Sequence, residues 1–280
     1  MAIFYNQATL SYNGFVTNSN ITSGEITDSL SFTKEVISAD YDVQDTVAYV
    51  VRIANGSNTA LNSVTLTDDL GAFTFGTGLL VPLEYVEGSL RLYIDGTLAT
   101  QQPNVEAGPP LVISNFTIPQ GSNALIIYEA RANEFAPLES GSEITNTATL
   151  GSGETDSATV PVRVEPKLSI TKVMSPDSVS DNDTVSYTFI LQNTGNAATV
   201  ATDDLIINDT FDPILSDITV TYNDTAWTEG TNYTYNEATG EFVTLPGQIT
   251  VPAATFTRDA VTGAVTVTPG VSVIEVTGTI

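Results

Sequence analysis

The sequence contains neither cysteine nor histidine in its 280 residues. These absences exclude disulfide bonds, thiol nucleophiles, the common zinc sites and Ser-His-Asp triads. Few classes of enzyme remain, and no set of residues converges on a reaction with an external substrate. We therefore expect a protein that is not an enzyme and that holds no cofactor.

Basic residues are scarce, with 8 Lys and Arg against 33 Asp and Glu and a net charge of −25. This charge excludes nucleic acid and anionic membrane surfaces as partners. Calcium stays open as a ligand, because DNDT (181–184), TDD (202–204) and NDTFD (208–212) gather acidic residues. None of them has the spacing of a known calcium loop, which favours solvated turns.

The sequence also lacks an apolar run of 18 residues and, at its beginning, a basic segment followed by an apolar core. We therefore expect no membrane span and no export signal. Such a chain stays in the cytoplasm until the cell opens. A mature exported chain whose signal peptide has been replaced by Met is the alternative.

Helical spacing of apolar residues is rare, whereas Val, Ile, Thr, Tyr and Phe recur in short alternating runs broken by Gly, Asn, Asp and Pro. This pattern predicts an all-β protein. The length of 280 residues allows two domains, each with its own core.

The sequence repeats itself with a period of about 138 residues. The matched stretches are LSFTKEV (30–36) with LSITKVM (168–174), and DTVAYVVRIANGSN (45–58) with DTVSYTFILQNTGN (183–196). We predict two tandem Ig-like or adhesin-type β-sandwiches, domain 1 over residues 27–165 and domain 2 over residues 166–280.

Domain 1 ends in a segment, EITNTATLGSGETDSATVPVRV (143–164), that has no counterpart in domain 2. The stretch FYNQATLSYNGFVTNSNITSGEI (4–26) matches it in order, so that Asn6 aligns with Asn146. We predict that domain 2 lacks its last strand. Residues 1–26 are predicted to form a donor strand or hairpin that turns at Asn-Gly (13–14).

A sandwich that lacks one strand exposes an unpaired edge and apolar side chains, which together are a template for another strand. The donor residues that share one strand face are Phe4, Asn6, Ala8 and Leu10. The connection 22–29 is short, which favours donation to the next subunit and a head-to-tail fibre. Closure within one molecule and a chance match are the alternatives.

Two of the three lysines, Lys34 and Lys172, hold equivalent places in the repeats. Strand alternation points both toward the core, together with one acid per domain, Asp68 or Asp209. The same alternation points Asn146 inward, and Asn6 at the equivalent place of the amino-terminal segment. The rival acids Asp45 and Asp183 begin strands after turns and are better explained as turn residues.

A buried lysine must be paired, neutralised or consumed. Desolvation lowers the pKa of an amine and raises that of a carboxyl group, so the amine becomes a nucleophile and the acid can polarise an amide. We predict a Lys34–Asn146 isopeptide bond within the subunit, assisted by Asp68. We also predict a Lys172–Asn6 bond between subunits, assisted by Asp209. Buried Lys-Asp salt bridges are the alternative in both domains.

The LSxTK opening, the DTVxYxxxxxN(x)G strand, TDDL (67–70) and ITNTATL (144–150) resemble the bacterial surface-repeat family catalogued as domain of unknown function eleven. The same residues are similar to collagen-adhesin-type sandwiches, which implies autocatalytic cross-linking by lysine, aspartate and asparagine. The chain also resembles the ribbon proteins of spore appendages in anaerobic spore-forming bacteria. That resemblance implies a spore-surface fibre released when the mother cell lyses.

The expected function is therefore that of a structural subunit of an extracellular or spore-surface fibre. Its partner is the protein itself, as a head-to-tail homopolymer, with room for anchoring or capping proteins. The alternative is an adhesin or ligand-binding module that uses calcium or the aromatic stretch WTEGTNYTYN (227–236). A hairpin that packs its own aromatic rings is the simpler explanation of that stretch.

Overall fold

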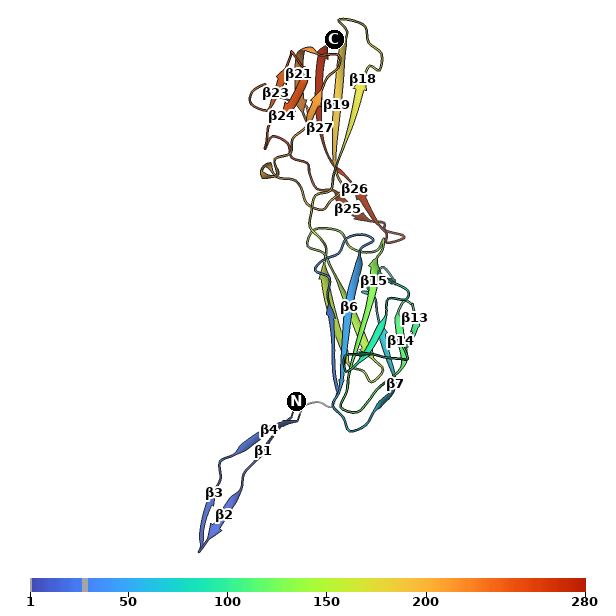
Figure 1. The fold of residues 1–280 in the computed structure, drawn as a ribbon, viewed down its shortest axis with the longest axis vertical. Helices are drawn as coiled ribbons and strands as arrows, with labels where there is room; N and C mark the ends of the chain where they lie inside the picture. The colour runs from blue at the N-terminus through green and yellow to red at the C-terminus, as the bar shows by residue number, and fades with distance from the viewer. Residues whose placement is uncertain (1, 27–29) are drawn as a thin grey trace. The chain divides into compact units, whose positions relative to one another are not determined.

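The computed structural model describes residues 2–26 and 30–280. Apart from a 3-10 helix, η1 (Ala201–Asp203), its regular elements in these ranges are all β-strands, so the predicted all-β fold is confirmed (Figure 1). In the same ranges, no helix has the length and the apolar character that a membrane crossing requires.

The amino-terminal hairpin, residues 2–26, consists of β1 (Ala2–Asn6), β2 (Thr9–Tyr12), β3 (Phe15–Asn18) and β4 (Thr22–Ile26). β1 pairs with β4 and β2 pairs with β3. The turn is formed by Asn13 and Gly14, whose φ angles of 46° and 83° suit a type I′ turn. Residues 4–23 are all exposed, and Phe15 reaches 80%.

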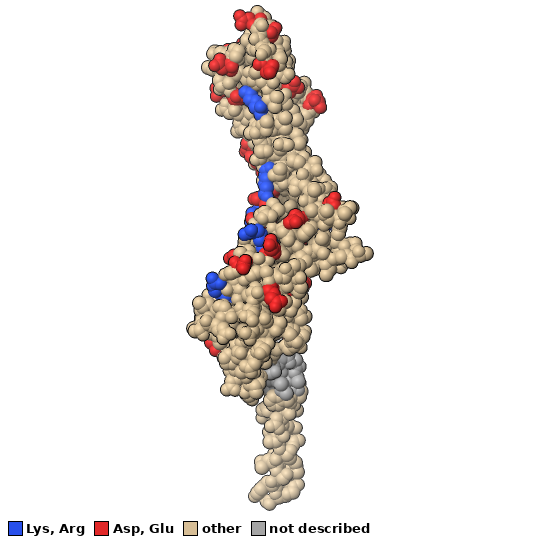
Figure 2. All heavy atoms as spheres, turned by 90° about the vertical axis from the view of Figure 1, so that its right-hand side faces the viewer, with Lys and Arg blue, Asp and Glu red and all other residues tan. Residues whose placement is uncertain are grey.

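The hairpin differs from the rest of the chain in charge. No charged residue precedes Glu25 in the sequence, whereas the whole chain carries −25. Figure 2 shows the visible face of the hairpin without a charged side chain. An exposed, uncharged hairpin with several large apolar side chains is typical of a segment that binds another surface.

The chain divides into two compact units, Met1–Asn133 with Ile144–Val160 and Glu134–Glu143 with Pro161–Ile280. The short segment Glu134–Glu143 belongs to the second unit because residues on strands of that unit donate hydrogen bonds to it. The Val265 amide N–H donates to the Glu134 carbonyl (2.8 Å), and the Arg258 guanidinium donates to the Phe135 carbonyl (3.1 Å).

The first unit contains a sandwich of two sheets, called here the first sandwich. One sheet has the order β12-β11-β15-β6-β5, with β10 also on β15, and the other has the order β13-β14-β7-β16-β17. Its strands are β5 (Leu30–Val36), β6 (Thr46–Asn55), β7 (Leu61–Asp68), β10 (Leu83–Tyr85), β11 (Arg91–Ile94), β12 (Thr97–Leu98), β13 (Asn104–Glu106), β14 (Leu111–Ile118), β15 (Asn123–Ala132), β16 (Glu143–Leu150) and β17 (Thr155–Pro161). β8 (Phe73–Phe75) and β9 (Gly78–Leu80) form a separate pair. Alternate residues of β6, β15 and β14 are buried between the sheets.

The second unit contains the second sandwich, with sheets in the order β18-β19-β27-β21-β22 and β20-β24-β23. Its strands are β18 (Leu168–Ser175), β19 (Thr184–Asn193), β20 (Asn208–Thr210), β21 (Ser216–Tyr222), β22 (Thr225–Ala226), β23 (Tyr233–Asn236), β24 (Glu241–Thr244), β25 (Thr255–Arg258), β26 (Val265–Thr268) and β27 (Gly270–Thr279). β25 and β26 form a separate pair. Phe189, Phe211 and Phe242 are central members of a single apolar core.

The two sandwiches differ at one edge. In the first, β7 pairs with β14 on one side and with β16 on the other, where Ala148 faces Asp68. In the second, β20 is the counterpart of β7 and pairs with β24, and no strand of the described residues lies on its other side. The second sheet of this sandwich therefore ends at β20, without equivalents of β16 and β17.

Candidate functional site

The first candidate site lies between the two sheets of the first sandwich. Its lysine, Lys34, is the fifth residue of β5, and alternation turns it inward. Lys34 Nζ lies 2.6 Å from Asp68 Oδ2, and both side chains have 0% exposure. The ammonium group also lies 4.9 Å from the centre of the Tyr49 ring. Burial lowers the pKa of Lys34, and the nearby Asp68 carboxylate opposes part of that change.

The asparagine of the site comes from β16 and is fully buried. Asn146 Nδ2 donates to the Tyr128 hydroxyl over 3.5 Å, and the Tyr128 hydroxyl in turn donates to Asp68 Oδ2. Asn146 Oδ1 has no hydrogen-bond partner among the described residues. The structure thus brings Lys34, Asp68 and Asn146 into one buried cluster, with Tyr128 as the link between acid and amide.

This arrangement can support amide exchange. In a desolvated ion pair the proton can pass from the Lys34 ammonium to the Asp68 carboxylate, which leaves a neutral amine. Attack of Nζ on Asn146 Cγ then forms a C–N bond. As the bond from Cγ to Nδ2 breaks, the Asp68 carboxyl group gives its proton to the departing nitrogen, which leaves as ammonia, and the carboxylate takes up the proton that Nζ loses in becoming an amide N–H. The unpartnered Oδ1 is the atom on which negative charge would develop.

The second candidate site has the same pair in a more open setting. Lys172 on β18 forms an ion pair with Asp209 on β20, and their side chains are 37% and 20% exposed. The Lys172 ammonium lies over the rings of Tyr187 and Phe211, 4.4 Å and 5.2 Å from their centres. Asn6 is exposed on the amino-terminal hairpin, and the structure of a single chain does not bring it to this pair.

The exposure of Lys172 follows from the free edge of β20. All eight residues of β18 are exposed, whereas Lys34 on the equivalent strand β5 is buried. Leu168 and Ile170, which alternation turns the same way as Lys172, are 44% and 54% exposed. In the first sandwich this side is covered by β16 and β17, and Asp156 of β17 accepts the Lys34 amide N–H over 2.7 Å. The second sandwich thus presents an uncovered apolar strip beside a lysine.

No protein-family model and no curated protein matches the sequence. Among solved structures, the chain is similar to the collagen adhesin of S. aureus, at 12% identity and a TM-score of 0.32 over 52% of this chain and 55% of that chain. It is similar to the RrgB pilus backbone of Streptococcus pneumoniae, at 11% and 0.34 over 86% and 55%. It is also similar to BcpA, the major pilin subunit of Bacillus cereus, at 12% and 0.35 over 96% and 73%. The chain spans 55% of the length of the first two proteins, and likenesses this distant do not assign a function.

Tyr128 is the site residue that the sequence interpretation missed. It is buried on β15 in an alternating run, and a buried hydroxyl requires a hydrogen-bond partner. Burial and the adjacent Asp68 carboxylate raise its pKa well above the usual value for tyrosine, so the hydroxyl stays protonated and available as a donor. Val276 holds the equivalent place on β27, because it faces Tyr187 as Tyr128 faces Tyr49.

The remaining sequence candidates lie in turns or in the core. The Asp45 and Asp183 carboxylates accept the amide N–H groups of Asp42 and Ser180, three residues earlier in each case. In residues 2–26 and 30–280, no group of three or more acidic side chains is placed to hold a metal ion. Trp227 packs against the core and Tyr233 is buried, so the aromatic stretch offers little exposed ring surface.

We expect Tyr128→Phe to slow the predicted cross-linking of Lys34 to Asn146. The change removes the hydroxyl that joins Asp68 to the amide and leaves Asn146 Nδ2 without its partner. A loss of about 1–3 kcal/mol of unfolding free energy should accompany it. The rate is measured by intact mass during refolding. Tyr41→Phe, another buried tyrosine of the same sandwich, is the control. Equal cross-linking rates in the two variants would show that the Tyr128 hydroxyl takes no part in the reaction.

Proposed function

We propose that this chain is a structural subunit of a self-assembling extracellular or spore-surface fibre. In this proposal the amino-terminal hairpin of one copy covers β18 and β20 of the next copy, and isopeptide bonds then lock the fold and the contact. The observation that carries the proposal is the uncovered edge of β20 beside an exposed apolar strand, in a chain that also presents an exposed hairpin of matching pattern.

The charge distribution supports association through the hairpin. Copies that each carry −25 repel one another at long range. The hairpin brings no charge before Glu25 and exposes Phe4 at 52% and Leu10 at 66%. Burial of such side chains contributes about 1.5–3 kcal/mol each. Main-chain hydrogen bonds along β20 would add to this, as in other cases of strand addition.

The alignment of the repeats gives the register of the proposed contact. Ala148 faces Asp68 in the first sandwich, so Ala8 of the donor is expected to face Asp209 of the acceptor. Asn6 then lies two residues away on the same face, next to Lys172. Covering by the hairpin would desolvate the Lys172–Asp209 pair, which favours the neutral amine. In this proposal the second cross-link forms only after docking.

The cross-link between subunits is tested with Lys172→Ala in the full chain. We expect a ladder of bands after boiling in denaturant for the wild type and only the monomer band for the variant, because the amine nucleophile is gone. Fibres should still be visible by electron microscopy, since docking does not require the covalent bond.

Lys167→Ala is the matched control, because Lys167 is the lysine that the cross-linking scheme does not use. It should keep the ladder. Asn6→Ala should lose the ladder as Lys172→Ala does, and the two variants mixed in one sample should not restore it beyond dimers. A ladder that survives in Lys172→Ala would show that another residue forms the bond.

A further inference from the structure

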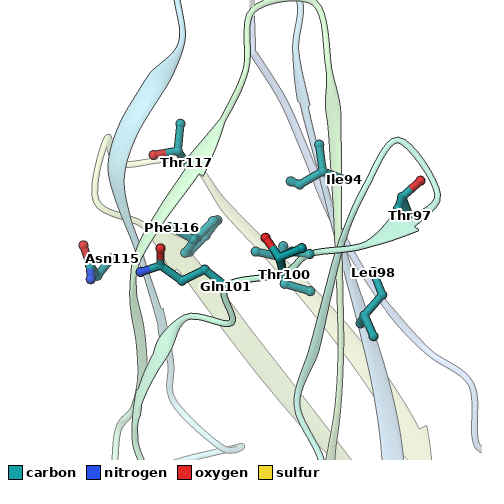
Figure 3. A pocket seen from close by; sticks show the side chains of 10 residues that line it. Ile94, Thr97, Leu98, Thr100, Gln101, Asn115, Phe116 and Thr117 are labelled. Carbon is teal, nitrogen blue, oxygen red and sulfur yellow. The ribbon is translucent and has the colours of Figure 1, made fainter.

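The first sandwich contains a hollow that the cross-linking scheme does not use. It lies between the β11–β12 hairpin and the end of β14, has a volume of about 480 Å³, and none of its ten lining residues is charged. Ile94 and Leu98 supply apolar surface, while Gln101 and Thr117 supply polar groups (Figure 3). Leu92 and Phe116, which are 2% and 4% exposed, form the floor of the hollow. In a chain of this acidity, a charge-free hollow favours an uncharged ligand.

The second sandwich shows what fills the corresponding space. The repeat aligns β6 with β19 and, through their registers, Ile126 of β15 with Ile274 of β27. Leu92 faces Ile126, and Tyr222 faces Ile274. Tyr222 therefore takes in the second sandwich the place that Leu92, a lining residue of the hollow, takes in the first.

Tyr222 is held by the main chain of Thr250, by the Ser272 hydroxyl over 3.3 Å and by one ring. Its hydroxyl donates to the Thr250 carbonyl and accepts the Thr250 amide N–H over 3.1 Å. Its ring packs against Trp227, with 5.1 Å between the ring centres. Ser272 Oγ also donates to the Thr250 carbonyl, over 2.8 Å, so the second sandwich satisfies this stretch of main chain with a phenol and a serine hydroxyl.

The residue equivalent to Thr250 is Thr117, which lines the hollow. The equivalence rests on a buried asparagine that both repeats share: Asn55 Nδ2 donates to the Pro119 carbonyl and Asn193 Nδ2 donates to the Pro252 carbonyl, each over 3.0 Å. Each threonine lies two residues before that proline.

The first sandwich has no side chain that takes the place of the phenol. Leu92 is shorter and carries no polar atom. Pairing of β13 with β14 stops at Ser114, so in the described part of the chain no strand runs along that edge at Thr117. We infer that the hollow is a binding site for a phenolic ring, with the ring against Leu92 and Phe116 and the hydroxyl on the main chain of Thr117.

This inference is independent of strand donation, and it allows two sources for the phenol. One is a free small molecule. The other is a tyrosine of a second copy, because two of the eleven tyrosines, Tyr5 and Tyr12, are exposed, at 68% and 72%, and both lie on the hairpin.

The test uses the full chain and N-acetyl-L-tyrosinamide as the probe, followed by amide chemical shifts. We expect saturable binding with shifts confined to β11, β12 and the end of β14, and about fivefold weaker binding of N-acetyl-L-phenylalaninamide, which lacks the hydroxyl. Ala99→Trp should abolish binding by filling the hollow from its rim, and Leu92→Tyr should do so by supplying the phenol within the chain. The control Leu79→Trp adds an indole at a 69% exposed position elsewhere and should bind as the wild type does.

Absence of saturable binding, equal binding of the two probes, or unchanged binding by both Ala99→Trp and Leu92→Tyr would overturn the inference. The source is distinguished with Tyr5→Ala/Tyr12→Ala in the full chain. If a second copy supplies the phenol, this variant binds the probe more tightly than the wild type, because the competing side chains are gone. Equal affinity assigns the site to a free phenol.

Discussion

A chain without residues 1–26 should remain monomeric under conditions in which the full chain forms fibres. The deletion removes the exposed hairpin and leaves both sandwiches, so the edge of β20 loses its proposed occupant. Sedimentation velocity and electron microscopy measure the result. The expected effect is complete loss of assembly, because the proposed contact has no other donor.

A synthetic peptide of residues 2–26 provides the complementary test. It should bind the truncated chain at one peptide per chain and should protect the amides of β18 and β20 from hydrogen exchange. Replacement of Leu10 by Asp in the peptide should abolish binding, because the carboxylate would be buried against an apolar strip. Replacement of Thr9, on the opposite face of the strand, by Asp is the control. Fibres formed by the truncated chain would end the donation proposal.

Closure within one molecule makes a different prediction. A full chain that fills its own edge would be monomeric. The deletion would then lower its stability and leave it monomeric. Wild-type chain mixed with truncated chain separates the two schemes. Donation between copies caps fibres with truncated chains and shortens them, whereas closure within one molecule produces no mixed species.

The sequence was sufficient to predict the all-β fold, because residue alternation and turn residues are local signals. The contact between Lys34 and Asp68 also follows from alternation, which places both residues between the sheets. Tyr128 could not be assigned to that contact, because the partner of a buried hydroxyl depends on how two sheets pack. The placement of Glu134–Glu143 in the second unit depends on long-range bonds of single backbone groups, and no sequence pattern records those.

The structure of the hairpin could also be predicted only in part from the sequence. Asn-Gly predicts its turn, but not the interruption between β1 and β2, where the Ala8 amide N–H donates to Ser19 Oγ over 2.9 Å. The uncharged character of the segment is visible in the sequence. Its meaning depends on the exposure of Phe4, Leu10 and Phe15, which the structure shows.

Asp68→Asn should prevent the cross-link in the first sandwich and leave a strongly destabilised domain. The change preserves size but removes the carboxylate that lies 2.6 Å from Lys34 Nζ at 0% exposure. A buried ammonium group without its partner costs about 3–5 kcal/mol. Removal of the carboxylate lowers the pKa of Lys34 further, but no acid then supplies the proton that the departing Asn146 nitrogen needs, so amide exchange stalls. The predicted intact mass is that of the variant without a cross-link, about 16 Da above a wild type that has lost one ammonia of about 17 Da, because the exchange of Asp for Asn itself removes about 1 Da.

The matched control for this prediction is Asp156→Asn, because Asp156 also contacts Lys34 but through the main-chain N–H and not through Nζ. That variant should keep the mass loss.

A wild type of unmodified mass would show that Lys34 and Asp68 form a salt bridge and nothing more. In that case Asp68→Asn should still destabilise the domain, whereas exchange of Lys34 and Asp68 together for Met and Leu should restore stability, since a well-packed apolar pair replaces a buried ion pair at little cost. If the cross-link forms, the same double change must lower stability, because it removes a covalent tie between β5 and β16. The sign of the change in unfolding free energy of this double variant therefore distinguishes a covalent cross-link from a salt bridge at this site.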